Sequence, residues 1–78
     1  MSKIAYIMAS KEILEGKGVK FTPEIEMGGK RTILTYCSHR GEVEIYISTN
    51  GLLSRCKLLV NGKKINPFKF LVRLQKEE

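Results

Sequence analysis

Four short turn signals, placed at nearly even intervals, constrain the fold of this chain more than any other feature of its sequence. The signals are Gly28-Gly29, His39-Arg40-Gly41, Asn50-Gly51 and Asn61-Gly62. Glycine and asparagine reach the positive φ angles that tight hairpin turns require, and Asn-Gly is the strongest short hairpin signal. A chain divided in this way is expected to fold as a series of antiparallel hairpins.

The segments between the turns have the composition of β-strands. In residues 42–49, Val43, Ile45 and Ile47 alternate strictly with polar or aromatic residues, which is the pattern of a strand with one buried face. Pro23 in the first segment indicates an edge strand or a bend. The expected strands are residues 19–27, 30–38, 42–49, 52–60 and 63–65.

A helix is expected after the last strand. Asn66 can act as its N-cap, and Pro67 suits the first helical position because its missing N–H has no partner there. Residues 67–76 carry a wide apolar face that can dock on the sheet. The sequence therefore predicts one small α+β domain over residues 1–78, an antiparallel β-meander of four or five strands, as a curved sheet or partial barrel, with a C-terminal α-helix packed on it.

The N-terminal segment is harder to assign. As a single helix it would place Lys11 and Glu15 inside the arc held by its apolar residues, which is a poor amphipathic pattern. We therefore expect a buried strand over residues 3–9, followed by a short helical segment from a Ser10 cap to Gly16.

The expected turns fix which residues share a face of the sheet. A three-residue loop at 39–41 would place Cys37 opposite Val43 and Ile33 opposite Ile47, and an Asn50-Gly51 turn would place Val43 opposite Leu58. The expected apolar face consists of Ile33, Cys37, Val43, Ile45, Ile47, Cys56 and Leu58.

The opposite face would then carry aromatic and basic side chains. In these registers Tyr46 pairs with Arg55, Glu44 with Lys57, and Tyr36 lies beside Glu44 with Phe21 next to it. Aromatic rings that can stack on bases, together with cations that meet phosphates, are typical of surfaces that bind single-stranded nucleic acid. The alternative is that this face is covered by a partial barrel or by the N-terminal segment, which would make Phe21 and Tyr36 core residues.

The charge balance also favours an anionic partner. Fourteen Lys and Arg residues against eight acidic ones give a formal net charge of +6. Such an excess on a small chain favours nucleic acid or an acidic protein surface. Lys69 and Arg73, with Lys76, line one side of the expected C-terminal helix and form a second basic edge.

Catalytic and metal chemistry find little support in the sequence. The chain has no Asp and one His, and Cys37, His39 and Cys56 are too few and too far apart for a metal site or a disulfide. Cys37 and His39 lack a third group to orient the imidazole, as a nucleophile and base would need. We expect no enzyme activity, no catalytic or metal residues and no cofactor.

We therefore expect a non-enzymatic nucleic-acid-binding domain, possibly for single strands, or a transcription-associated regulatory domain. The candidate nucleic-acid-binding residues are Tyr36, Tyr46, Arg55, Lys57, Lys69 and Arg73. The alternative is a small protein-interaction module or inhibitor that binds an acidic protein. No stretch is apolar enough for a membrane span, so a soluble cytoplasmic protein is expected, with a homodimer as a further possibility.

Overall fold

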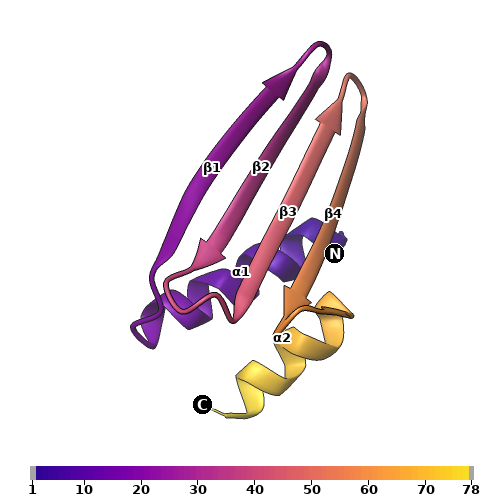
Figure 1. The fold of residues 1–78 in the computed structure, drawn as a ribbon. Coiled ribbons are helices and arrows are strands. Elements are labelled where there is room, and N and C mark those ends of the chain that lie inside the picture. The colour runs from indigo at the N-terminus through magenta and orange to yellow at the C-terminus, as the bar shows by residue number, and fades with distance from the viewer. Residues whose placement is uncertain (1, 78) are drawn as a thin grey trace.

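The fold consists of a five-stranded sheet with two helices on one of its faces (Figure 1). The computed structural model describes residues 2–77. Its elements, in chain order, are α1 (Lys3–Gly16), β1 (Phe21–Gly28), β2 (Arg31–Ser38), β3 (Val43–Asn50), β4 (Leu53–Val60), β5 (Lys63–Ile65) and α2 (Pro67–Lys76).

The strands follow one another in the sheet in the order in which they occur in the chain, each antiparallel to the next. β1 and β5 do not pair, so the sheet is open. This confirms the predicted α+β meander with a C-terminal helix, and of the two expected forms it is the sheet and not the partial barrel that occurs. Short connections between neighbouring strands account for the order, because each hairpin turn delivers the chain beside the strand it has just left.

Two of the hairpin turns lie one residue later than the sequence predicts. The paired residues Gly28 and Arg31 flank one turn, and Asn50 and Leu53 flank the other. Gly51 has a φ of +62° and is the first of the two turn residues, the place where a type II′ turn requires glycine. Moving a turn by one residue shifts the pairing by two, so both faces of the hairpin stay as predicted.

The connection between β2 and β3 has four residues where three were predicted, and this changes the faces. The side-chain oxygen of Ser38 accepts a hydrogen bond from the backbone N–H of Val43, and the carbonyl of Ser38 accepts one from the N–H of Gly41. β2 therefore ends at Ser38, and Tyr36, not Thr35, pairs with Ile45. A shift of one residue turns every side chain of β2 to the other face.

The core lies between the sheet and the two helices. Ile45 and Leu58, paired neighbours on β3 and β4, are each 1% exposed. They pack with one residue of α1 and two of α2 in a cluster that comprises Ile7, Val43, Ile45, Leu58, Phe70 and Leu74. The prediction that Ile33 and Cys37 belong to the core is wrong, because the register of β2 places both on the opposite face.

The prediction of a strand over residues 3–9 is also wrong, since a single helix occupies residues 3–16. Its N-cap is Ser2, while Ser10 lies inside the helix and donates a hydrogen bond to the carbonyl of Tyr6. α1 packs against both the sheet and α2, so its apolar side chains spread over a wide arc and the helical period is hidden. Lys11 is accommodated because its stem is buried while its ammonium reaches Glu15 at 3.0 Å.

α2 matches its predicted bounds. The side-chain oxygen of Asn66 accepts a hydrogen bond from the N–H of Lys69, and Pro67 occupies the first turn. Phe70, Leu71 and Leu74 are buried. The ring of Phe68, by contrast, is half exposed and packs in an edge-to-face arrangement with the ring of Tyr6 on α1.

The helices cover one half of one face of the sheet. In Figure 1 the tips of the two long hairpins, β1–β2 and β3–β4, extend well beyond both helices. All the buried strand residues, which are Ser38, Val43, Ile45 and Leu58, point to the helix side. The other face, which we call the open face, contains no buried side chain among the described residues.

Candidate nucleic-acid interface

The open face is organised in rows of side chains that run across the strands. One row consists of Glu24, Thr35, Tyr46 and Lys57, and the next towards the hairpin tips consists of Glu26, Ile33, Ser48 and Arg55. Each row begins with a carboxylate on β1 and ends with a cation on β4. The open face therefore carries a charge gradient, and an anionic ligand is attracted to its β4 side.

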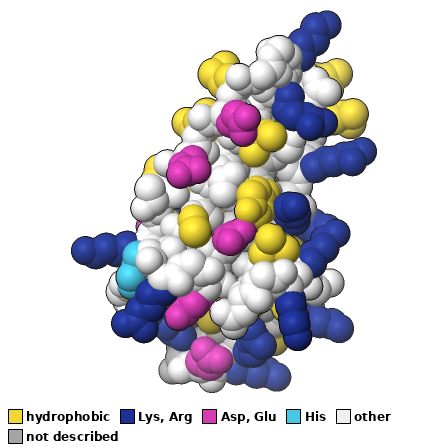
Figure 2. All heavy atoms as spheres, in the orientation of Figure 1, with side chains coloured by type: hydrophobic (Ala, Val, Ile, Leu, Met, Phe, Trp, Pro, Cys, Tyr) yellow, Lys and Arg dark blue, Asp and Glu magenta, His cyan; other side chains and the backbone are white. Residues whose placement is uncertain are grey.

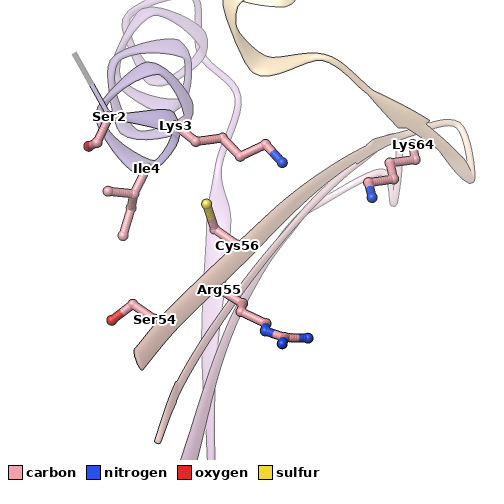
Figure 3. A pocket seen from close by; sticks show the side chains of 7 residues that line it. All are labelled: Ser2, Lys3, Ile4, Ser54, Arg55, Cys56 and Lys64. Carbon is pink, nitrogen blue, oxygen red and sulfur yellow. The ribbon is translucent and has the colours of Figure 1, made fainter. Parts of the chain in front are cut away.

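Four cations converge where β4, β5 and the start of α1 meet. Lys3, Arg55 and Lys64 line a groove of about 530 Å³ together with Ser2, Ile4, Ser54 and Cys56 (Figure 3). Two adjoining hollows are lined by Lys57 and again by Lys64. We call Lys3, Arg55, Lys57 and Lys64 the basic cluster. In Figure 3 Lys3 extends from the end of α1 towards the side of the groove where Lys64 lies.

No ion pair within residues 2–77 involves the basic cluster. The ion pairs in this range are Lys11 with Glu15 and Lys17 with Glu77. Figure 2, which looks onto the open face, shows Lys and Arg side chains gathered along the side of β4, with acidic side chains over the other strands. A group of cations beside a groove, without ion pairs in the described part of the chain, is a feature that sites for polyanions commonly have.

Tyr46 lies next to this cluster in the middle of the open face. Its hydroxyl donates a hydrogen bond of 2.5 Å to the carboxylate of Glu44, and the ammonium of Lys57 lies 4.7 Å from its ring centre. The hydrogen bond, partial burial and the negative charge of Glu44 together raise the pKa of Tyr46. The ring is thus held at a fixed place, with a cation resting on one of its sides.

The predicted site residue Tyr36 lies on the other face of the sheet. Because of the β2 register, its ring packs against the core, and the ammonium of Lys11 lies 4.6 Å from its centre and 5.6 Å from that of Phe21. The prediction that Tyr36 and Phe21 share a surface with Tyr46 is therefore wrong. Both rings instead correspond to the alternative in which they are core residues.

The structure brings three of the predicted residues together and leaves two apart. Tyr46, Arg55 and Lys57 line one hollow on β3 and β4, although Tyr46 pairs with Lys57 and not with Arg55. Lys69 and Arg73 are exposed on α2 and line none of the three hollows. The guanidinium of Arg73 rests 5.3 Å from the ring centre of Phe70.

Two members of the basic cluster were not predicted from the sequence. Lys3 belongs to the segment that was expected to be a strand, so its place at the start of a helix was not foreseen. Lys64 pairs with Leu59 through the three-residue strand β5. The position of Lys64 could have been predicted from the turn signal Asn61-Gly62, because the pairing that this turn fixes places Lys64 on the same face as Lys57.

The cysteines and the histidine are dispersed. Cys37 and Cys56 are free thiols on opposite faces of the sheet. The Nδ1 atom of His39 accepts a hydrogen bond from the backbone N–H of Lys20, and the backbone N–H of His39 donates one to the carbonyl of Lys20. These two bonds tie the β2–β3 loop to the segment just before β1. Within residues 2–77 no three metal-ligating side chains gather at one point.

Comparisons with models of protein families, with curated proteins and with solved structures give no match to this chain. Neither helix in the described part of the chain has the length and apolar content needed to cross a bilayer.

Proposed function

We propose that this protein is a non-enzymatic nucleic-acid-binding domain that holds a single strand along the basic cluster, as a transcription-associated regulatory protein in the cytoplasm would. The observation that carries the proposal is the convergence of four cations, none of them in an ion pair within residues 2–77, on a groove and the adjoining hollow that Tyr46 lines. Cations supply most of the affinity for a phosphate backbone, and an adjacent ring offers a stacking platform for a base.

The spacing of the cations favours an extended ligand. Arg55 and Lys57 are two residues apart on one strand, so their Cα atoms lie about 7 Å apart and their side chains share a face. Lys64 continues this line on β5, and Lys3 reaches the groove from α1. A flexible single strand can follow such a line around the edge of β4, whereas a stiff duplex cannot bend into it.

Lys57 has a second role in this proposal. In the free protein its ammonium rests against the ring of Tyr46. A base that stacks on Tyr46 displaces the ammonium, which then meets the phosphate of the same strand. The ring and the cation thus respond to one ligand together, and the Glu44 hydrogen bond holds the ring in place during the exchange.

Fluorescence anisotropy with labelled single-stranded DNA, single-stranded RNA and duplex DNA, recorded over a series of salt concentrations, tests the proposal. The double variant Arg55→Gln/Lys57→Gln is expected to lower the slope of log affinity against log salt by about 0.7 per lost phosphate contact. The matched control is Lys69→Gln/Arg73→Gln, which removes the same charge from α2. It is expected to leave the slope nearly unchanged.

A different result would redirect the proposal. Equal losses in the two double variants would mean that net charge alone attracts the ligand, and a larger loss in the α2 variant would move the site to the helix. No affinity for any nucleic acid at low salt would contradict the proposal. The cluster would then serve the alternative function, binding an acidic protein, to which the outer edge of β4 beyond its pairing with β5 adds unpaired backbone groups.

A further inference from the structure

The outer edge of β4 beside the basic cluster carries backbone groups that no other strand of the described chain covers. β5 pairs only with residues 58–60, so residues 53–57, nearer the hairpin tip, have no strand beside their outer edge within residues 2–77. Ser54 and Cys56 belong to this part of β4, and both line the groove of the basic cluster (Figure 3). An uncovered strand edge is therefore one of the walls of the groove.

The pairing of β3 with β4 determines which backbone groups point towards the groove. The N–H of Asn61, just after β4, donates a hydrogen bond of 2.7 Å to the carbonyl of Glu42 across the β3–β4 ladder. In an antiparallel pair, residues that bond to the neighbouring strand alternate with residues whose N–H and C=O point away from it. Counted back from Asn61, the N–H and C=O groups of Ser54 and Cys56 point away from β3, and no backbone group within residues 2–77 pairs with them.

These backbone groups differ in the ligand atoms that they can bind. The N–H groups donate hydrogen bonds, as the cations do, and both match the phosphate oxygens of DNA and RNA alike. A carbonyl only accepts a hydrogen bond, and the sugar-phosphate backbone of a DNA strand has no donor to offer it. RNA has a donor in every nucleotide, the ribose 2′-hydroxyl, and this is the group by which a protein can distinguish RNA from DNA.

From the geometry of this edge we infer that the groove selects single-stranded RNA over single-stranded DNA. The inference rests on the proposed function and specifies its ligand. The 2′-hydroxyl groups of the bound strand donate hydrogen bonds to the carbonyls of Ser54 and Cys56, while its phosphates meet the basic cluster.

The carbonyls and the cations repeat at the same interval along β4. The carbonyls of Ser54 and Cys56 belong to residues two apart on the strand, as do the side chains of Arg55 and Lys57, and each interval spans about 7 Å. A strand that follows β4 with its phosphates at the two cations therefore passes its sugars along the two carbonyls.

The other groups of the site bind both kinds of strand. The ring of Tyr46 can stack on a base of either, and the basic cluster attracts the phosphates of either. A DNA strand in the groove displaces water from the two carbonyls without replacing its hydrogen bonds, and an acceptor left without a partner costs free energy. An RNA strand replaces those bonds, so the selection depends on the carbonyls.

Fluorescence anisotropy with three oligonucleotides of one sequence, RNA, DNA and 2′-O-methyl RNA, tests this inference. The methyl group removes the hydrogen-bond donor but keeps the ribose. RNA is expected to bind about tenfold more tightly than either of the others, because it makes two additional hydrogen bonds. The slope of log affinity against log salt is expected to be the same for all three, because the phosphate contacts are the same.

Two substitutions at Ser54 test whether the backbone edge makes the selection. Ser54→Pro keeps the pairing with β3, because the N–H of this residue points outwards, while the proline ring crowds the edge. It is expected to reduce the preference for RNA over DNA. Ser54→Ala is the matched control, because it removes only the side-chain hydroxyl, and it is expected to keep the preference. Circular dichroism confirms that both variants are folded.

The outcomes separate this inference from the proposed function. Equal affinities for RNA and DNA would overturn the inference and leave the proposed function standing, as would 2′-O-methyl RNA that binds as tightly as RNA. Loss of the preference in Ser54→Ala, or its full retention in Ser54→Pro, would overturn the role of the backbone edge. No affinity for any of the three oligonucleotides would overturn the proposed function together with the inference.

Discussion

The phenol of Tyr46 donates a hydrogen bond to a carboxylate on its own strand, and this contact alters how its proton titrates. The bond to Glu44, partial burial and the charge of Glu44 all favour the neutral phenol and raise its pKa. An unfolded chain has a tyrosine pKa of about 10. The folded state therefore holds this proton more tightly, and the stability it gains is present below pH 10 and is lost as pH rises through the raised pKa.

A spectrophotometric titration of tyrosinate checks this expectation. Tyr46→Phe is expected to remove the component of the curve that titrates at the highest pH. Glu44→Gln is expected to move that component to lower pH, because it removes the negative charge beside the phenol and replaces the carboxylate acceptor by a weaker amide oxygen. The far-ultraviolet circular dichroism of each variant confirms that the fold persists during the measurement. A curve that Tyr46→Phe only scales down, without loss of its late part, would mean that the hydrogen bond does not hold in solution.

Ile45 and Ile33 distinguish the observed register of β2 and β3 from the one predicted from the sequence. Ile45 is 1% exposed beneath both helices, and Ile33 lies half buried on the open face. Ile45→Ala is expected to cost about 2–5 kcal/mol of unfolding free energy, since it leaves a cavity in a packed core. Ile33→Ala is expected to cost clearly less in the same urea denaturation series, and equal costs would restore the predicted register.

At the scale of single elements, the hairpins show which features can be predicted from a sequence. The turn signals place the strands to within two residues, because glycine and asparagine occur where positive φ angles are needed. They do not fix the length of the β2–β3 loop, since the Ser38 hydroxyl that ends β2 acts through a side-chain hydrogen bond with no pattern of its own. The shared face of Tyr46, Arg55 and Lys57 was predicted correctly, because a turn displaced by one residue preserves the face, although the predicted pairing of Tyr46 with Arg55 was wrong. The face of Tyr36 was predicted wrongly.

Gly51 allows the turn chemistry to be tested separately from packing. Its φ is +62°, and a Cβ added there would meet no atom within 4 Å, so any cost of substitution comes from the backbone. Gly51→Ala is expected to destabilise the fold by about 1–2 kcal/mol in thermal or chemical denaturation.

Gly28→Ala is the matched control for Gly51→Ala, because that position is equally open but its φ is not positive. It is expected to be neutral or slightly stabilising, since alanine restricts the unfolded chain. Similar changes in unfolding free energy for Gly51→Ala and Gly28→Ala would show that the turn does not require the positive φ angle at Gly51.

α1 shows why an element that contacts two neighbours is difficult to predict. An amphipathic pattern reveals a helix that buries one face, but α1 has one side towards the sheet and another towards α2. Lys11 lies on the side towards the sheet, with its side chain only 14% exposed and its ammonium over the rings of Phe21 and Tyr36. A lysine in that position reads as polar in the sequence although its stem is part of the packing.

At the scale of the whole molecule, the two halves of the sheet differ in how far the helices cover them. The half near the helices holds the core, and the half with the hairpin tips carries the exposed side chains of Ile25 and Met27 on one face and the end of the charge gradient on the other. The principal extents of 41, 27 and 21 Å reflect this projecting half. The order of the strands was predictable from the turns, but the extent of helix coverage depends on contacts between distant segments and was not.

Removal of α2 is expected to abolish cooperative unfolding. Phe70, Leu71 and Leu74 of this helix are buried, and without them Ile45 and Leu58 would face water. A chain that ends at Ile65 is expected to lose its sharp thermal transition and to bind a hydrophobic dye, as loosely packed states do. A truncated chain with an undiminished transition would show that α1 and the sheet suffice.

The meeting of the first and last helices in one core has a consequence for the order of folding. The hairpins join neighbouring segments and can form quickly, as local contacts do. The contacts of Ile7 with Phe70 and Leu74, however, can form only after α2 has been synthesised, because α2 leaves the ribosome after every strand. During synthesis the nascent sheet therefore keeps part of its apolar face uncovered until α2 emerges, and a chaperone that shields exposed apolar surface has its opportunity in that interval.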